Sequence, residues 1–554
     1  MVILGRMLRS LHSWRGVGSA AALTVSLCSV AGQVQGQRSP LGKLDTGAVC
    51  YEIFVRSFFD SDGDGIGDLR GLTQKLDYVN DGNPRTHRDL GARCIWLMPV
   101  AESPSYHGYD VSNYYRVEPD YGTNDDFKKF VAAAHQRGIH VLVDMVLNHA
   151  SSEHPYFKAA LNDTASPYRS WFRFAATKPA MKGPWGQEAW HKSPVRDEYY
   201  YGVFWSGMPD LNYETPAVRE EAKKIARFWI TEMGVDGFRL DAVPYLVEEG
   251  THLSGSRGTH EVLHEYGDYV RRIAPNAFTV GEVWDSVGAM LPYYPDQLDG
   301  YFAFEVSDAI LDAVRSGSSK RLFAPLLRLQ RSEPAYRWSP FLRNHDQTRT
   351  LTVLGGDVER AKLAATLLLT LPGLPFVYYG EEIGMTGDKP DERLRTPMQW
   401  SRGASAGFTR GRPWEPLQSD TATANVEAED ADSASLLNVY RRMIQLRASN
   451  AALAKGELIP LESSNDAVVG YLRRDGRRVV MVVANLGRTF AERTNFSSNG
   501  AVLAPGEYVA SALLGGRRVS NVVVDRDGRI RNYAPMATIS SLERLVVELR
   551  PRKR

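Results

Sequence analysis

An α/β fold built around a closed barrel of parallel strands is predicted by three features of the sequence. From Ala48 onward, apolar runs of strand type alternate with amphipathic helical stretches, an order that indicates βα units and a parallel sheet. Eight such strands can be counted, which is the number in a (β/α)₈ TIM barrel. With 554 residues, the chain is long enough for that barrel and an additional module.

The eight predicted strands are short and several of them end in polar residues. In chain order they are Val49–Arg56, Arg93–Pro99, His140–Asp144, Val235–Leu240, Ala277–Glu282, Leu298–Glu305, Ser339–Asn344 and Leu374–Tyr379. Because the active sites of such barrels gather at the C-terminal ends of the strands, we expect the functional residues to lie there.

Two regions depart from the βα repeat. Residues 150–213 separate the third strand from a helix predicted at Pro216–Met233, and they are too long for one connecting loop, so we expect an inserted subdomain. Its many aromatic side chains could stack on sugar rings or could simply form a small core. After a helix predicted at Ser433–Leu446, short β-type runs with turn signals such as Asp475-Gly476 predict an antiparallel C-terminal β-sandwich.

The N-terminus has the pattern of an export signal. Arg6, Arg9 and Arg15 precede the apolar run Val17–Gly32, and a stretch rich in Gln, Gly, Ser and Pro follows. We therefore expect residues 1–36 to be cleaved off near Gly32–Gly36, leaving a secreted or periplasmic protein that is not held in a membrane. The rest would divide into barrel segments 37–149 and 214–453, the insert 150–213 and a C-terminal domain 454–554.

Net charge and cysteine content bear on whether the chain binds nucleic acid and whether it contains a disulfide. The formal net charge is +1, which provides no electrostatic reason to expect nucleic acid, and we expect a monomer. Cleavage of the export signal would leave Cys50 and Cys94, at the starts of neighbouring strands. They could form a disulfide, but one pair does not define a disulfide scaffold, so we expect two buried thiols.

Acidic residues end or follow three of the predicted strands, at Asp241, Glu282 and Asp346. Arg239 and Asp241 are two residues apart on one strand, so both side chains point the same way and the guanidinium can keep the carboxylate ionised. Glu282 precedes Trp284, an aromatic neighbour that would raise the pKa of a general acid. Each group alone is ambiguous, since an Arg-x-Asp pair is often only a structural ion pair.

The order of these groups closely resembles the conserved regions of the α-amylase family, glycoside hydrolase family thirteen. The matching segments are Asp144–His149, the groups around Asp241, Glu282 and Asp346, and the stretches Gly91–Pro99, Met208–Asn212 and Gly373–Met385. The resemblance implies a retaining, two-step cleavage of α-glucan in which Asp241 is the nucleophile, Glu282 the acid/base and Asp346 the transition-state stabiliser.

Further roles follow from the same resemblance. The side chains implied to bind sugar are His107, Tyr109, His149, Arg239, His345 and Arg395, with Tyr109 stacking at the cleavage subsite. Asp144 is implied to be a structural support.

An acidic loop between the first strand and the next helix predicts a metal site. Its oxygens recur at alternate positions and its glycines permit a sharp turn, which suits a hard cation such as Ca²⁺. It departs from an EF-hand because the twelfth position is Gly71 rather than Glu. The loop resembles a calcium site of several family branches, with ligands Asp60, Asp62, Asp64, the Ile66 carbonyl and Asp68; an unliganded acidic turn is the alternative.

The specificity signals partly conflict. Tyr106 stands where exo-acting α-glucosidases of the family commonly have an aspartate that seals the pocket, which favours endo-hydrolysis of α-1,4 bonds in starch and maltooligosaccharides. Phe238–Leu246 and Phe59–Gly71 instead resemble maltose-isomerising trehalose synthases, whereas Gly281–Trp284 and Asn344–Arg349 look hydrolase-like. We expect an endo-acting α-amylase, with exo-glucosidase or trehalose synthase action as alternatives. A non-catalytic scaffold, as in amino-acid-transporter heavy chains, is disfavoured because all three carboxylates are present.

Overall fold

The computed structural model describes residues 41–552. The predicted export signal, residues 1–36, lies outside this range. Among the described residues, no helix combines the length and apolar character that a membrane crossing would need.

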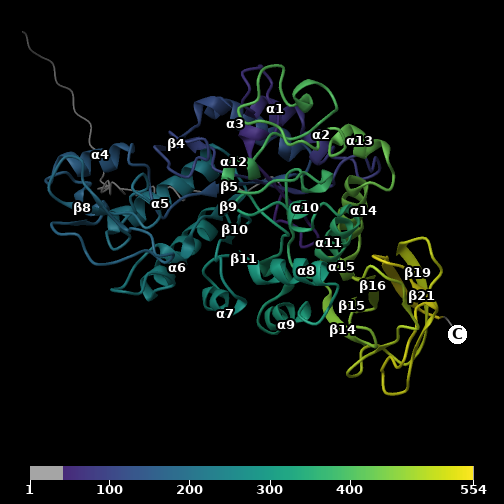
Figure 1. The fold of residues 1–554 in the computed structure, drawn as a ribbon. Helices are drawn as coiled ribbons and strands as arrows, with labels where there is room; N and C mark the ends of the chain where they lie inside the picture. The colour runs from purple at the N-terminus through teal and green to yellow at the C-terminus, as the bar shows by residue number, and fades with distance from the viewer. Residues whose placement is uncertain (1–40, 553–554) are drawn as a thin grey trace, which may run out of the picture. The chain divides into compact units, whose positions relative to one another are not determined.

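Eight parallel strands form the predicted barrel, in the spatial order β12-β11-β10-β9-β5-β2-β1-β13 (Figure 1). Their bounds are β1 Cys50–Ile53, β2 Cys94–Leu97, β5 His140–Met145, β9 Gly237–Leu240, β10 Phe278–Gly281, β11 Gly300–Phe302, β12 Trp338–Ser339 and β13 Phe376–Tyr378. Two backbone hydrogen bonds join the last two strands: Leu374 N–H donates to the Trp338 carbonyl (2.8 Å) and Phe376 N–H to the Pro340 carbonyl (2.9 Å). These bonds close the barrel.

Each predicted strand overlaps an observed strand, but most predictions run past the observed ends, and two of the overruns have a clear physical reason. The predicted strand Leu298–Glu305 ends early because Phe304 already begins helix α8 (Phe304–Ser316), whose buried Val306, Ile310 and Val314 follow a helical period. The predicted strand Ser339–Asn344 stops at Ser339 because Pro340 has no N–H with which to continue the ladder.

Side chains alternate between the barrel interior and the surrounding helices. Cys50, Trp96, Val280 and Phe302 belong to one buried cluster with the other inward-facing side chains, whereas neighbours such as Tyr51 belong to the cluster shared with the helices. The interior is therefore a packed core, and the polar residues at the strand ends lie above it.

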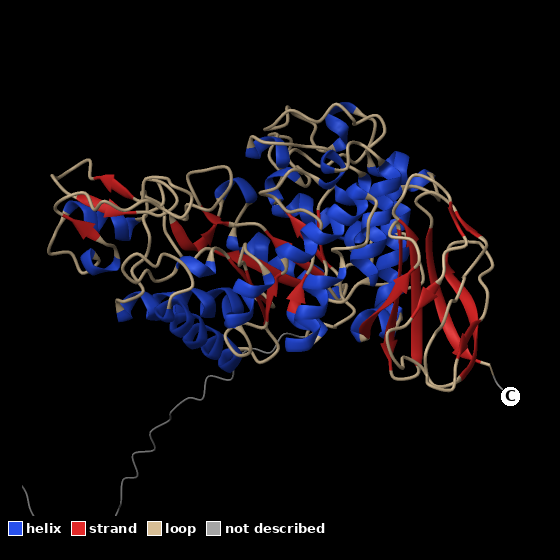
Figure 2. Ribbon diagram, turned by 60° about the horizontal axis from the view of Figure 1, so that its bottom comes forward, coloured by secondary structure: helices blue, strands red, loops and turns tan. Residues whose placement is uncertain are grey.

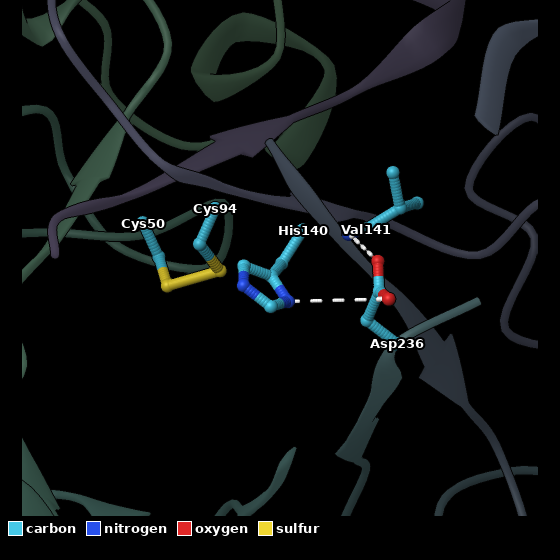
Figure 3. Close-up of a disulfide and its surroundings, with 5 residues drawn as sticks. All are labelled: Cys50, Cys94, His140, Val141 and Asp236. Atoms are coloured by element: carbon cyan, nitrogen blue, oxygen red, sulfur yellow. Dashed lines mark hydrogen bonds and ion pairs between the residues drawn. A yellow bond between two sulfur atoms is a disulfide. The ribbon is translucent and has the colours of Figure 1, made fainter. Parts of the chain in front are cut away.

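Cys50 and Cys94 form a disulfide in this interior, so the expectation of two free thiols was wrong. The two residues are direct partners in the β1–β2 ladder, with Cα atoms 4.3 Å apart, and both side chains point inward. Figure 3 shows the disulfide beside His140 and near Asp236, whose Oδ2 accepts a hydrogen bond from Val141 N–H (2.8 Å). A cross-link over 44 residues restricts the unfolded chain and thereby stabilises the fold.

Helices surround the barrel strands (Figure 2). The longer ones are α3 Asn124–Gln136, α5 Pro216–Arg227, α6 Arg257–Ile273, α8, α9 Phe323–Ser332, α11 Val358–Thr370 and α14 Leu436–Ser449. The shorter ones are α1 Leu69–Gln74, α2 Leu76–Val79, α7 Val287–Met290, α10 Thr350–Val353, α12 Asp391–Leu394, α13 Val426–Ala431 and α15 Ala451–Lys455. Both helices predicted from sequence are present: α5 continues as a π-helical turn over Phe228–Glu232, and Ser435 caps the N-terminus of α14.

The region between β5 and α5 carries its own small fold. It contains α4 (Pro155–Asn162) and a three-stranded antiparallel sheet of β6 (Phe174–Ala175), β8 (Tyr199–Tyr201) and β7 (Trp190–Lys192). A separate two-stranded ladder, β3 (Ala101–Glu102) with β4 (Asn113–Val117), follows β2. Both segments extend from the C-terminal ends of barrel strands, where the predicted site lies.

The C-terminal residues form the predicted antiparallel β-structure. Its main sheet contains β18 Phe496–Ser497, β14 Glu457–Ser463, β15 Val468–Asp475, β16 Arg478–Asn485, β22 Arg544–Pro551, β19 Gly506–Leu514 and β20 Val522–Val524, in that order, and β17 Ala491–Glu492 pairs with β21 Thr538–Ile539. The predicted hairpin joins β15 to β16 through Gly476-Arg477, with Gly476 at φ +58°.

The two faces of this main sheet have different partners. Along β16, Val480 and Val482 belong to the core shared with the barrel helices, while Met481 and Val483 belong to a second core that includes residues of β17 and β21. Figure 1 shows β14 beside α9 and β15 beside α15, in agreement with the contacts between these elements. The sheet is therefore covered on both faces.

Candidate active site

The predicted site residues meet at the C-terminal ends of the barrel strands, around a cavity of about 550 Å³. His107, Tyr109, His149, Asp241, Glu282, Asp346 and Arg395 line this cavity. The other two predicted residues, Arg239 and His345, lie buried beneath it and contact the lining residues from below. All nine residues therefore belong to one site, although they come from segments up to 288 residues apart in sequence (Arg395 minus His107).

The guanidinium of Arg239 joins three carboxyl groups. Its Nη1 lies 2.7 Å from Oδ1 of Asp241 and 2.8 Å from Oδ1 of Asp144, and its Nη2 lies 2.8 Å from Oε2 of Glu282. Arg239 is almost fully buried and packs within 5.2 Å of the Trp96 ring centroid. One fixed cation therefore holds Asp241 and Glu282 side by side, and Asp144, which the sequence suggested as a support, anchors that cation from behind.

The pKa values of the three lining carboxyl groups are shifted in different directions. Burial raises the pKa of Asp241 and of Glu282, only partly opposed by the charge of Arg239. For Asp346 the burial effect is overcome by His345 and Arg395, so its pKa lies far below the usual range. Asp346 is therefore ionised, whereas burial favours the protonated forms of Asp241 and Glu282.

His345 and Arg395 fix the position of Asp346. Nε2 of His345 lies 3.2 Å from Oδ2 of Asp346, and Nη2 of Arg395 donates to Oδ1 across 2.8 Å. Arg395 Nε also donates to the His345 carbonyl (3.1 Å). The far side of the His345 ring contacts Glu52, a residue that the sequence analysis did not single out.

The predicted sugar-stacking residue Tyr109 lies against the ring of His345, with centroids 5.5 Å apart and planes 15° from parallel. Its hydroxyl donates to Asp144 (3.0 Å). Behind it, His149 contacts the Tyr109 carbonyl through Nε2 (3.0 Å), and burial lowers the pKa of His149 to about 4. Burial likewise lowers the pKa of His107. Both of these lining histidines are therefore neutral near neutral pH.

Three tryptophans with large exposed surfaces line the cavity: two belong to the aromatic residues of the insert that were considered for sugar stacking, and the third was predicted only as a neighbour of Glu282. Trp185, Trp205 and Trp284 are 62%, 50% and 56% exposed. Trp284 is parallel to Phe304 within 12°, at a centroid distance of 5.1 Å, and Trp185 lies 5.5 Å from Tyr245. Aromatic rings held in place and left open to solvent are suited to pack against sugar rings. For Trp185 and Trp205, the only sequence evidence was the high aromatic content of the insert.

A comparison with protein families adds an independent line of evidence. Residues 52–456 match the family described as alpha amylase, catalytic domain, which is more than half of the chain. The chain belongs to the α-amylase family. It is a glycoside hydrolase of family thirteen, and its substrate is a carbohydrate.

Several relatives in the α-amylase family share most of their length with this chain. Alpha-amylase 3 of Dictyoglomus thermophilum is 38% identical, over 80% of this chain and 85% of the relative. A trehalose synthase/amylase of Mycolicibacterium smegmatis is 35% identical (80% and 84%), and an oligo-1,6-glucosidase of Parageobacillus thermoglucosidasius is 32% identical (81% and 90%). The crystal structure of an alpha-amylase from H. orenii has a TM-score of 0.79 at 38% identity, covering 91% of this chain and 100% of that one. These names include different activities, so membership of the α-amylase family alone does not fix the specificity.

The acidic loop, residues 60–68, contains the predicted metal ligands of this α-amylase family member. Carboxylate oxygens of Asp60, Asp62 and Asp68 all lie within 4.8 Å of one another, whereas Asp64 does not join this group. Instead, Asp64 accepts a hydrogen bond from Ile66 N–H (2.7 Å), and burial together with the charges of Asp62 and Asp60 raises its pKa. Three clustered hard oxygen donors fit Ca²⁺, and they are only part of the predicted set of five.

Proposed function

We propose that this member of the family is an α-amylase that cleaves α-1,4-glucosidic bonds of starch and maltooligosaccharides with retention of configuration. Asp241 is the nucleophile, Glu282 the acid/base and Asp346 the transition-state stabiliser. The observation that carries the proposal is that Arg239 contacts both Asp241 and Glu282, at 2.7 and 2.8 Å, and so places a nucleophile and a proton donor on one fixed cation.

The two steps follow from these positions. Asp241 attacks the anomeric carbon while Glu282 transfers its proton to the departing glycosidic oxygen, so one C–O bond forms as the other breaks. Glu282, now ionised, then takes a proton from water, whose oxygen displaces Asp241 and restores both groups. The positive charge that develops on the sugar ring in the transition state of each step is stabilised by Asp346, which His345 and Arg395 keep ionised.

Preference for internal bonds is supported by the aromatic residues in the cavity and beside it. Tyr106, rather than an acidic side chain, stands at the position that seals exo-acting pockets, and its ring stacks on Trp414 at 5.3 Å. Its hydroxyl accepts a hydrogen bond from Arg395 (3.3 Å). The exposed tryptophans that line the cavity add apolar surface against which sugar rings can pack.

The distribution of products tests the specificity. Incubated with starch and separately with maltose, the protein with residues 1–36 removed is expected to release mixed maltooligosaccharides early in the reaction and to leave maltose largely unchanged. Chromatography of samples taken at low conversion makes the distinction. Glucose as the first product would favour exo-glucosidase action, and trehalose formed from maltose would favour isomerisation; either result rejects the endo-hydrolase.

We also propose that the acidic loop binds Ca²⁺ through Asp60, Asp62 and Asp68, with Asp64 and the Ile66 carbonyl available as further ligands. Asp60 is held ready by backbone N–H groups of Gly63 and Gly65, which donate to it at 2.7 and 2.8 Å. The hydroxyl of Thr409 also donates a hydrogen bond to Asp60. The proposed ligand Asp60 therefore already links the loop after β1 to a segment far along the chain.

Calcium is therefore expected to raise the melting temperature of the chelator-treated protein. A ligand at about one hundred times its dissociation constant stabilises a fold by about 2.7 kcal/mol. The increase, measured by differential scanning calorimetry with and without Ca²⁺, should be lost in Asp62→Asn. Equal increases in parent and variant would place the ion elsewhere.

A further inference from the structure

Glu52 is a buried acidic residue to which the proposed reaction assigns no role. It lies on β1, on the opposite side of His345 from the cavity, and is only 2% exposed. Its Oε1 lies 2.6 Å from Nδ1 of His345, which is itself completely buried. Burying a carboxylate is costly unless a partner compensates, so the short contact with His345 requires an explanation.

The hydrogen-bond partners of His345 determine where its protons are. Nδ1 faces a Glu52 oxygen, and Nε2 faces Oδ2 of Asp346 at 3.2 Å and the hydroxyl of Tyr109 at 2.7 Å. The one proton of the Tyr109 hydroxyl can go to Asp144 (3.0 Å) or to Nε2 of His345 (2.7 Å). With that proton on Asp144, a neutral ring would leave one nitrogen lone pair directed at a carboxylate oxygen, whereas a doubly protonated ring donates on both sides.

The charged groups around His345 also favour its doubly protonated state. The titratable and charged groups around His345 and Glu52 are Tyr109, Asp144, Arg239, Asp241, Glu282, Asp346, Tyr378 and Arg395. Burial raises the pKa of Glu52, and the charges of His345 and Arg239 oppose that rise. Burial lowers the pKa of His345, but Asp346 and Glu52 outweigh this effect and raise the pKa to about 10.

We propose that Glu52 is a positioning residue that holds His345 as an imidazolium, so that its Nε2–H points at Asp346 and the sugar beside it. Glu52 touches neither substrate nor reacting atoms; it acts through His345. The consequence for the reaction rests on the proposed function: a cationic donor keeps Asp346 oriented and ionised, and it remains cationic across the pH range in which a free histidine would lose its proton. The protonation state itself is independent of which bond the enzyme cleaves.

Glu52→Gln tests the proposal because the amide keeps the shape of the side chain and removes only its charge. In protein labelled with ¹⁵N histidine, both ring nitrogens of His345 are expected to remain protonated from about pH 6 to about pH 9 in the parent. In Glu52→Gln the ring is expected to titrate within that range. The His345 signals are assigned by their loss in His345→Asn.

Kinetics on an aryl α-maltoside provide the second measurement. The alkaline limb of the parental kcat/KM profile reports deprotonation of Glu282, so the expected effect of Glu52→Gln is a second alkaline limb, about a tenfold loss, at the pH where its His345 ring titrates. In a His345→Asn background, Glu52→Gln should add no such limb. A second limb that persists without His345 would mean that Glu52 acts directly on another group, and the proposal would be rejected.

Glu382→Gln is a matched control. Glu382 is equally buried, follows β13, and accepts hydrogen bonds from Tyr51 and Tyr78 at 2.6 Å, away from His345. The Glu382→Gln variant is expected to change the melting temperature, but it should change neither the titration of His345 nor the alkaline side of the kcat/KM profile. If Glu52→Gln does not fold, Glu52→Asp provides a second variant: it keeps the charge and should therefore retain the imidazolium of His345. A neutral His345 in the parent near pH 7, or an imidazolium that persists in Glu52→Gln, would overturn the proposal whatever the activity.

Discussion

Asp241→Asn is expected to lose on the order of 10⁴-fold or more in kcat on starch while retaining its fold, because the amide cannot form the glycosyl ester on which the first step depends. The substitution is nearly isosteric, and the amide oxygen can still accept from Arg239 Nη1, which lies 2.7 Å from the native carboxylate. Initial rates on soluble starch together with thermal unfolding would measure both effects.

Asp285→Asn is the matched control for this variant. Asp285 is exposed and lies three residues beyond Glu282, outside the group of residues held by Arg239. Its amide variant should keep parental activity, so a loss at Asp241 alone cannot be attributed to a general charge effect at the rim of the cavity. Near-parental turnover of Asp241→Asn would remove Asp241 from the role of nucleophile.

Glu282→Gln is expected to have the second largest effect, a loss of about 10² to 10⁴-fold on starch, since proton transfer to the departing oxygen contributes an acceleration of that order. The loss should be much smaller for an α-maltosyl fluoride, because fluoride leaves without protonation. A ratio of the two rate losses near one would contradict the role of Glu282 as acid.

The pH dependence of this variant provides a further check. Burial raises the pKa of Glu282, and the acid must be protonated to act, so parental kcat/KM should fall as pH rises through that raised pKa. Asp241 must be ionised, so kcat/KM should rise as pH increases through the pKa of Asp241. On starch, Glu282→Gln should lose the limb that reports Glu282 deprotonation, and for the fluoride substrate, whose departure needs no acid, that limb should be absent already in the parent.

The barrel could be predicted from local sequence because each βα unit carries its own pattern. The eight apolar runs overlap the eight strands, and the ends of the fourth, fifth and seventh runs indicated Asp241, Glu282 and Asp346. Errors occurred where a local pattern was ambiguous, as at Phe304, where an apolar run of strand type passes directly into a helix.

Features that depend on the register between distant segments could not be predicted from local sequence patterns. Cys50 and Cys94 form a disulfide because they are direct partners in neighbouring strands, a relation that their spacing does not specify. Glu52 and His345 are 293 residues apart and meet only when the barrel closes. The exposed orientation of Trp284 likewise depends on packing against Phe304 from the following βα unit.

The central claim is that Asp241 becomes covalently glycosylated during turnover, and it can be observed directly. In Glu282→Gln treated with an α-maltosyl fluoride, the first step should proceed and the second should be slow, because no carboxylate remains to activate water. Mass spectrometry of the intact protein and of its acid-quenched peptides should then find one maltosyl group on the peptide that contains Asp241. A maltosyl group on another residue, or the parental enzyme releasing the β-anomer first with no covalent adduct, would contradict the account.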